Sequence, residues 1–169
     1  MTRDPIVFMG VAGCGKSTLG AAVARAEGVP MIEGDDYHSA ENRDKMRRGI
    51  ALTDSDREGW LHTLGELLRE HPDGVALTCS ALKRSYRALL RGAAPNLRFV
   101  FLEISREDSL ARVASRGPTH YFSPSLVDSQ FATLESPVGE PRVLRVDALA
   151  PLSRQQEEVH AWLHADEPR

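Results

Sequence analysis

The stretch Gly10-Val11-Ala12-Gly13-Cys14-Gly15-Lys16-Ser17 decides the fold. It fits the pattern G-x-x-x-x-G-K-[ST], in which a glycine-rich loop surrounds phosphate groups with backbone N–H groups. The apolar run 6–9 before it is typical of a buried strand, and the spacing of apolar residues after it predicts a helix. Because the motif requires this strand–loop–helix context, we predict a phosphate-binding loop rather than a glycine-rich turn that binds nothing.

The residue types in this loop predict how a nucleoside triphosphate would be held. The positive end of the following helix adds to the attraction of the backbone N–H groups. Lys16 is expected to reach the β- and γ-phosphates as a catalytic cation, and the Ser17 hydroxyl to bind Mg²⁺. The expected nucleotide-binding residues are Gly10, Gly13, Cys14, Gly15, Lys16, Ser17 and Thr18.

Length and composition limit the class of protein. A chain of 169 residues is expected to form one domain, 1–169. Its net charge of −3 argues against nucleic acid or an anionic membrane as the main partner. It has no N-terminal apolar segment or apolar run long enough to cross a bilayer, and its two cysteines, Cys14 and Cys79, lack metal-ligand spacing. These features together predict a cytoplasmic protein.

Apolar runs alternate with helical patterns along the rest of the chain. Such alternation predicts a parallel sheet with helices on both faces, which is an α/β three-layer sandwich of the P-loop NTPase type with five strands. Ligands of such sheets gather at the carboxyl ends of the strands, where Gly10, Asp35, Ser80 and Asp147 are expected. The expected strands are 6–9, 29–32, 75–79, 97–103 and 143–146, and the expected helices include 39–48, 60–68, 83–91, 105–117, 124–134 and 152–164.

A kinase needs a second site that presents a hydroxyl to the γ-phosphate. The segment of about 34–61 is unusually rich in polar side chains that suit a polyhydroxylated acid, although a solvated surface would show the same pattern. Arg57 is expected to grip a carboxylate, and Asp35 either orients the hydroxyl or helps to hold Mg²⁺. A GTPase is disfavoured because no N-K-x-D sequence occurs. The polar residues are Asp35, Asp36, His38, Asn42, Lys45, Asp54, Asp56, Arg57 and Trp60.

Two further clusters carry positive charge. Ser80 is expected to cap a basic helix that places Lys83 in its first turn, where an anionic ligand would suit it, and Arg87 and Arg91 are expected to be solvated or paired at the surface. The segment of about 112–122 is a candidate lid. Its Arg112 and Arg116 lie one helical turn apart and are either catalytic cations or an exposed pair.

Several blocks in order resemble the thermoresistant, P-loop family of gluconokinases. They are Gly34-Asp35-x-x-His38, Asn42-x-x-Lys45-Met46-x-x-Gly49, Leu52-x-Asp54-x-Asp56-Arg57, Trp60-Leu61, Cys79-Ser80-Ala81-Leu82-Lys83, Tyr86-Arg87 and Ser129-Gln130-Phe131-x-x-Leu134-Glu135 with Pro137. The resemblance implies a fold similar to that of nucleoside monophosphate and shikimate kinases, and phosphorylation of D-gluconate at its 6-hydroxyl by ATP with Mg²⁺. It also implies a possible homodimer, and it places gluconate near Asp35, His38, Lys45, Arg57, Lys83, His120 and Gln130.

One departure from the family pattern concerns the lid. The family has Arg-x-Gly-His before an aromatic pair, whereas this chain has Arg116-Gly117-Pro118-Thr119-His120, which is one residue longer. Two alternatives to a gluconokinase stay open from the sequence. One is a related kinase of another small hydroxy acid such as shikimate, and the other is a nucleotide sensor without acceptor chemistry.

Overall fold

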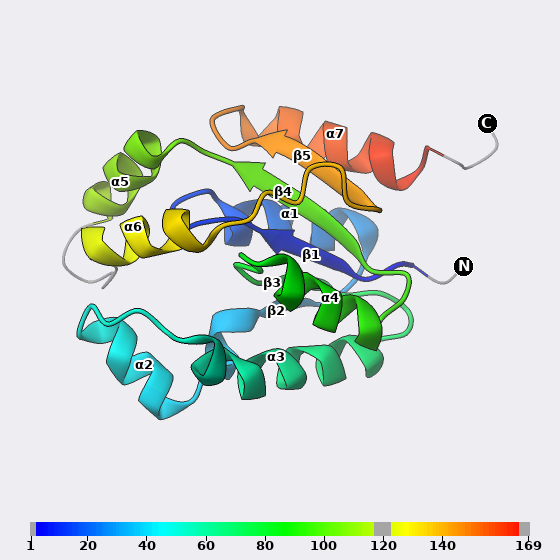
Figure 1. Ribbon diagram of the computed structural model, residues 1–169. Helices are drawn as coiled ribbons and strands as arrows, with labels where there is room; N and C mark the ends of the chain where they lie inside the picture. The colour runs from blue at the N-terminus through cyan, green and yellow to red at the C-terminus, as the bar shows by residue number, and fades with distance from the viewer. Residues whose placement is uncertain (1–2, 117–122, 166–169) are drawn as a thin grey trace.

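Five parallel strands form one sheet, in the order β2-β3-β1-β4-β5, in the computed structural model (Figure 1), which describes residues 3–116 and 123–165. The expected α/β fold with a five-stranded parallel sheet is therefore confirmed. The strands are β1 (Ile6–Met9), β2 (Met31–Glu33), β3 (Ala76–Thr78), β4 (Arg98–Glu103) and β5 (Val143–Asp147).

Helices cover both faces of the sheet, which gives three layers (Figure 1). None of the helices in residues 3–116 and 123–165 is long and apolar enough to cross a membrane. The helices are α1 (Lys16–Glu27), α2 (Ala40–Arg47), α3 (Asp54–Arg69), α4 (Arg84–Ala93), α5 (Arg106–Ser115), α6 (Pro124–Thr133) and α7 (Leu152–Leu163), and the 3₁₀ turn η1 is Gly34–Tyr37.

The fully apolar strand β1 supplies both cores because alternate side chains of a strand point to opposite faces. Val7 and Met9 pack with α3 and α4 on one face. Ile6 and Phe8 pack with α1 and α7 on the other. Apolar side chains therefore cover both faces of the central strand. This packing fixes the position of the phosphate loop that follows it.

Gly34 holds the carboxyl end of β2 against β3. A Cβ atom at this position would lie 2.1 Å from the Thr78 carbonyl oxygen, so only glycine fits. Its N–H donates to the Thr78 hydroxyl at 3.2 Å, and its carbonyl accepts from the Trp60 indole N–H at 2.8 Å. Because of this close approach, Glu33 and Asp35 are held rigidly on either side of Gly34, at the carboxyl edge of the sheet.

Helix α4 differs from the expectation at its start. It begins at Arg84 with Lys83 as the N-terminal flanking residue, so Ser80 does not cap it. Arg87 is not at the surface: its side chain is fully buried and donates to the carbonyl oxygens of Ala81 and Leu82. The helix therefore uses a buried arginine to fix the loop that follows β3.

Glu140 is the counter-charge of this arginine, and we expect Glu140→Ala to lower the free energy of unfolding by about 3–5 kcal/mol, because it leaves a buried guanidinium without a negative charge beside it. The Glu140 carboxylate lies 2.6 Å from Arg87 Nη2 and 2.8 Å from Arg91 Nη1. Urea unfolding measures the loss. The matched control is Glu58→Ala, an exposed position on α3 where a change within about 0.5 kcal/mol is expected.

The same ion pair gives the stability an acid dependence. Burial opposes ionisation of Glu140, but hydrogen bonds from Arg87 and Arg91 outweigh it and hold the pKa of Glu140 below its usual value. Its contribution is therefore complete above the unfolded pKa of about 4.3 and is lost as the pH falls through the lower folded pKa. Glu140→Gln should remove this part of the acid dependence, and equal acid curves for wild type and variant would contradict the assignment.

Candidate active site

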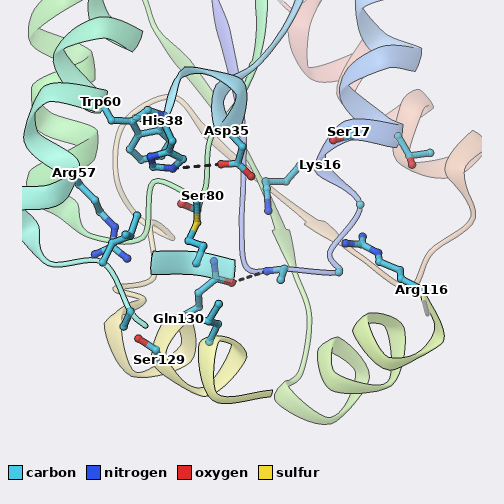
Figure 2. A pocket seen from close by; sticks show the side chains of 18 residues that line it. Lys16, Ser17, Asp35, His38, Arg57, Trp60, Ser80, Arg116, Ser129 and Gln130 are labelled. Carbon is cyan, nitrogen blue, oxygen red and sulfur yellow. Dashed lines mark hydrogen bonds and ion pairs between the residues drawn. The ribbon is translucent and has the colours of Figure 1, made fainter. Parts of the chain in front are cut away.

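A cavity of about 200 Å³ lies at the carboxyl edge of the sheet, where the phosphate loop meets η1, α3 and α6 (Figure 2). The sheet topology brings together side chains that are far apart in the sequence. Lys16 and Asp35 point into the same space, with Arg57 and Arg116 on either side of it (Figure 2). The expected site residues that line this cavity are Gly13, Gly15, Lys16, Ser17, Thr18, Asp35, His38, Arg57, Arg116 and Gln130.

The phosphate loop has the backbone shape that its glycines permit. Gly13 and Gly15 have φ angles of 79° and 96°, a left-handed conformation that glycine adopts at little cost. Lys16 Nζ donates to the carbonyl oxygens of Gly10 and Val11 at 3.0 and 3.2 Å, so its ammonium group lies at the mouth of the loop. Gly10 and Cys14 do not line the cavity, and the buried Cys14 side chain packs in the core beneath the loop.

Glu33 does not line the cavity but contacts the phosphate loop, and the sequence analysis did not predict this contact. Its Oε2 atom accepts from the Ser17 hydroxyl at 3.0 Å and from the Thr78 hydroxyl at 2.7 Å. Carboxylate and hydroxyl oxygens are the ligand types that Mg²⁺ prefers. The signal available in the sequence was its place directly after the expected second strand, 29–32. Ser17, which is expected to hold the metal with Asp35, donates its hydroxyl hydrogen to Glu33 in this structure.

His38 is held as a neutral side chain beside Asp35. Its ring stacks on Trp60, with centroids 4.0 Å apart, and only 7% of the residue is exposed. Burial lowers the pKa of His38 although the nearby Asp35 carboxylate opposes this. Its Nε2 atom lies 3.7 Å from the Asp35 carboxylate. His38 can therefore give a hydrogen bond to a neutral hydroxyl or to the carboxylate without carrying charge.

Arg57 is held by an aromatic residue from α4. Its Nη1 atom donates to the Tyr86 hydroxyl at 3.1 Å, and its guanidinium lies 5.5 Å from the centre of the Tyr86 ring. The Tyr86 hydroxyl in turn donates to Asp54, and this bond with that from Lys83 lowers the pKa of Asp54. The guanidinium is thus positioned at the cavity wall with donors left for an anion.

Two lysines expected to bind the acceptor lie outside the cavity lining. Lys83 Nζ is 2.9 Å from Asp54, and Lys45 Nζ is 2.9 Å from Asp56. Asp56 also forms a reciprocal cap with Thr53 at the start of α3, and these hydrogen bonds, from the Thr53 backbone and then Lys45, lower its pKa to about 2. The resemblance placed both lysines near gluconate, and each is paired here with a carboxylate of the segment 34–61.

The remaining expected residues lie around the phosphate loop. Gln130 Oε1 accepts from the Ala12 N–H at 2.7 Å, so α6 contacts the loop directly. Arg112 does not line the cavity, and its guanidinium donates to the carbonyl oxygens of Gly13 and Ala148 at 3.0 and 2.9 Å. Its role as a catalytic cation stays a prediction. His120, with 117–122 of the expected lid, lies outside the described residues.

Comparisons with known proteins agree with this arrangement. Residues 12–132 match the family model described as shikimate kinase. The chain is 46% identical over 143 residues to a probable gluconokinase of Schizosaccharomyces pombe, which covers 79% of this chain and 74% of the relative. It is 38% identical to the thermosensitive gluconokinase of Escherichia coli over 87% of this chain and 80% of that protein.

A solved structure extends the likeness to three dimensions. The crystal structure of a gluconokinase from Sinorhizobium meliloti 1021 is 47% identical to this chain, with a TM-score of 0.89. The superposition covers 96% of this chain and 92% of that chain. The similarity therefore includes the whole sheet and the segments around the cavity.

Proposed function

The chain belongs to the gluconokinase family, a family of phosphotransferases, and on this premise we propose that it transfers the γ-phosphoryl group of ATP to the 6-hydroxyl of D-gluconate. The observation that carries the proposal is that the phosphate loop, Asp35 and Arg57 all line one cavity. One end of this cavity suits a triphosphate, and the other offers a cation and a carboxylate to a hydroxy acid. A kinase that holds both substrates in one space accelerates transfer mainly by positioning and charge stabilisation.

The proposed roles follow from where each side chain lies. Arg57 binds the gluconate carboxylate, and Asp35 with the neutral His38 orients the hydroxyl that attacks. Lys16 and Arg116 stabilise the charge of the transferring phosphoryl group. Gln130 and Ser129 lie at the α6 side of the cavity and are available to the acceptor hydroxyls.

The oxygen donors near the phosphate loop fit Mg²⁺. Ser17 and Glu33 would hold the ion directly or through its water ligands, because they offer hard oxygen atoms 3.0 Å apart beside the loop. Asp35, on the other side of Gly34, remains a proposed contributor. When bound, Mg²⁺ neutralises phosphate charge.

The substrate assignment is tested by a coupled assay of ADP release with a panel of acceptors. We expect Mg²⁺-dependent turnover with D-gluconate and little with shikimate, nucleoside monophosphates or uncharged D-glucose. If gluconate leaves the rate of ADP release unchanged while shikimate raises that rate, the assignment of gluconate as the substrate is wrong. ATP binding without turnover on any hydroxy acid would favour a nucleotide sensor.

We expect Arg57→Ala to raise KM for gluconate roughly 10–150-fold, the value of one lost charged hydrogen bond, while KM for ATP changes little. Steady-state kinetics with each substrate varied in turn separates the two effects. The matched control is Tyr86→Phe, which removes the hydroxyl that Arg57 Nη1 contacts but keeps the guanidinium. A smaller rise in KM for gluconate is expected there, and equal loss of both substrates in Arg57→Ala would contradict the site.

We expect Glu33→Gln to raise the Mg²⁺ concentration for half-maximal rate roughly 10–100-fold, as is usual when a group that supports a metal is removed. A Mg²⁺ titration at fixed ATP measures the shift. Glu103→Gln is the matched control, because Glu103 also ends a strand but pairs with Arg145 at 2.9 Å instead of with a residue of the phosphate loop. An unchanged Mg²⁺ requirement in Glu33→Gln would exclude Glu33 from the metal site.

Several wider expectations stay proposals. They are the single domain 1–169 with an acceptor segment at about 34–61 and a lid at about 112–122, the cytoplasmic location that use of ATP favours, and the homodimer that the resemblance implies. Nucleic acid and membranes are not expected partners of a chain with net charge −3. Light scattering on the purified chain measures its oligomeric state.

A further inference from the structure

Two histidines and a glutamate meet where the last turn of α7 packs against the end of α1, away from the phosphate loop. His160 lies in the last turn of α7, His164 directly follows its last residue, Leu163, and the centres of the two rings are 4.4 Å apart. Glu27 is the last residue of α1. The described part of the chain therefore brings a potential set of metal ligands to one point between its first and last helices.

The distances in this cluster suit a small cation. Glu27 Oε1 lies 3.4 Å from His160 Nδ1 and 3.0 Å from His164 Nε2, and one ligand atom of each residue lies within 4.8 Å of the others. Ligand atoms around tetrahedral Zn²⁺, with bonds of 2.0–2.1 Å, are about 3.3 Å apart. The two histidine–carboxylate distances already have this size, and rotation of the exposed His160 ring can adjust the third.

The position of Glu27 calls for a positive partner. Only 10% of its side chain is exposed, and it lies at the C-terminal end of α1, where the helix dipole disfavours a negative charge. Glu157 lines the same surface groove as Glu27 and His160 and adds further negative potential.

We propose that Glu27, His160 and His164 bind one Zn²⁺ ion that joins the end of α7 to the end of α1. Two imidazole nitrogens and one carboxylate form a ligand set that Zn²⁺ accepts and Mg²⁺ does not prefer, with water at the fourth position. The side chain of His160 is 66% exposed, which gives the ion a path from solvent. The site stabilises the protein rather than taking part in the reaction, because a helix of twelve residues places it roughly 18 Å from the phosphate loop.

The test is a titration of the untagged, chelator-treated chain with ZnCl₂ at pH 7.5 without nucleotide. Calorimetry should give one equivalent bound per chain, and the thermal unfolding midpoint should rise roughly 5–10 °C when free Zn²⁺ is about 100 times Kd. MgCl₂ at the same concentration should give no such rise. Binding should weaken as the pH falls, because a metal binds only the deprotonated imidazole.

Variants decide whether these three residues form the site. Glu27→Gln, His160→Gln and His164→Gln should each weaken Zn²⁺ binding on the order of 100-fold, at least as much as loss of a supporting group. His62→Gln is the matched control, since His62 is exposed on α3 and should leave binding unchanged. Because His160 is mostly exposed, its variant keeps the fold, and circular dichroism verifies this.

Three results would overturn the proposal. The first is no saturable Zn²⁺ binding, and the second is Zn²⁺ affinity in His160→Gln and Glu27→Gln equal to that of wild type. The third is a loss of Zn²⁺ affinity in His62→Gln as large as that in the ligand variants. The first would mean that the cluster is only a proton-sharing contact. Kinase turnover with Mg²⁺ and without Zn²⁺ should be unchanged in His160→Gln. Absence of Zn²⁺ binding would therefore not contradict the proposed kinase function. Absence of turnover with gluconate would likewise not contradict the zinc site.

Discussion

Replacing Lys16 by Ala is expected to lower kcat about 10³–10⁵-fold, the range found when a cation that stabilises phosphoryl transfer is removed. The ammonium group lies at the mouth of the phosphate loop, where it donates to the Gly10 and Val11 carbonyl oxygens at 3.0 and 3.2 Å. A bound triphosphate offers stronger acceptors than these neutral carbonyls, so the lysine would move its hydrogen bonds to the phosphates. Without it, no other side chain of the loop supplies a positive charge at this place.

The coupled assay measures this loss of turnover at saturating ATP and gluconate. Lys16→Arg is the matched control, because it keeps the charge while its planar guanidinium cannot occupy the position of a compact ammonium group. An intermediate rate is expected for it. Retention of more than about a tenth of the wild-type kcat in Lys16→Ala would contradict the assigned role, because that loss is below the range for such a cation.

Asp35→Asn is expected to lower kcat about 10²–10⁴-fold, the usual contribution of a positioned acid or base. Its carboxylate follows β2, lines the cavity and lies 3.7 Å from His38 Nε2. Asparagine keeps the size of the side chain but cannot accept a proton or attract a cation. The effect should therefore fall on kcat, with a much smaller change in KM for ATP.

The neighbouring residue provides a sharp control. Asp36 is exposed and does not line the cavity, so Asp36→Asn should leave kcat within about a factor of two, as expected for a surface change. The pH dependence of kcat/KM separates the two possible roles of Asp35. Loss of an acid limb in Asp35→Asn would support a base, whereas a raised Mg²⁺ requirement would support a role in holding the metal.

Much of the fold could be predicted because its signals are local. Apolar runs and helical spacing are properties of neighbouring residues, and they placed all five strands within about three residues at their ends. Ser105 and Ser123 accept the hydrogen bonds that begin α5 and α6, as residues of this type before a helix predict. The error at the start of α4 arose because Ser80 was taken for a cap that the chain does not use.

The site was predictable where the topology alone decides it. Lys16 and Asp35 each follow a parallel strand, and the carboxyl ends of such strands share one edge of the sheet. Glu33 was missed because a strand residue gives no signal of its own for which side chain it will face. Only the structure shows its carboxylate beside the Ser17 hydroxyl.

Charge pattern was the weakest guide to the site. Lys45, Arg57 and Lys83 look equivalent in the sequence as cations available to an acidic substrate, but nearby carboxylates engage the two lysines. Which carboxylate reaches which cation depends on the path of α2 and α3 through space. Charge pattern also failed to predict the burial of Arg87. This cation was expected at the surface, but it is buried with its counter-charge, Glu140.

The close approach at Gly34 also bears on how sequences of this fold should be read. The nearest obstacle to a side chain there is the main chain of the adjacent strand, not a ligand. A glycine at the equivalent place in another protein with the same strand spacing therefore carries no information about what that protein phosphorylates. We therefore expect differences in substrate specificity among such proteins to arise from the two carboxylates that flank this glycine and from the side chains across the cavity, because these positions can be substituted.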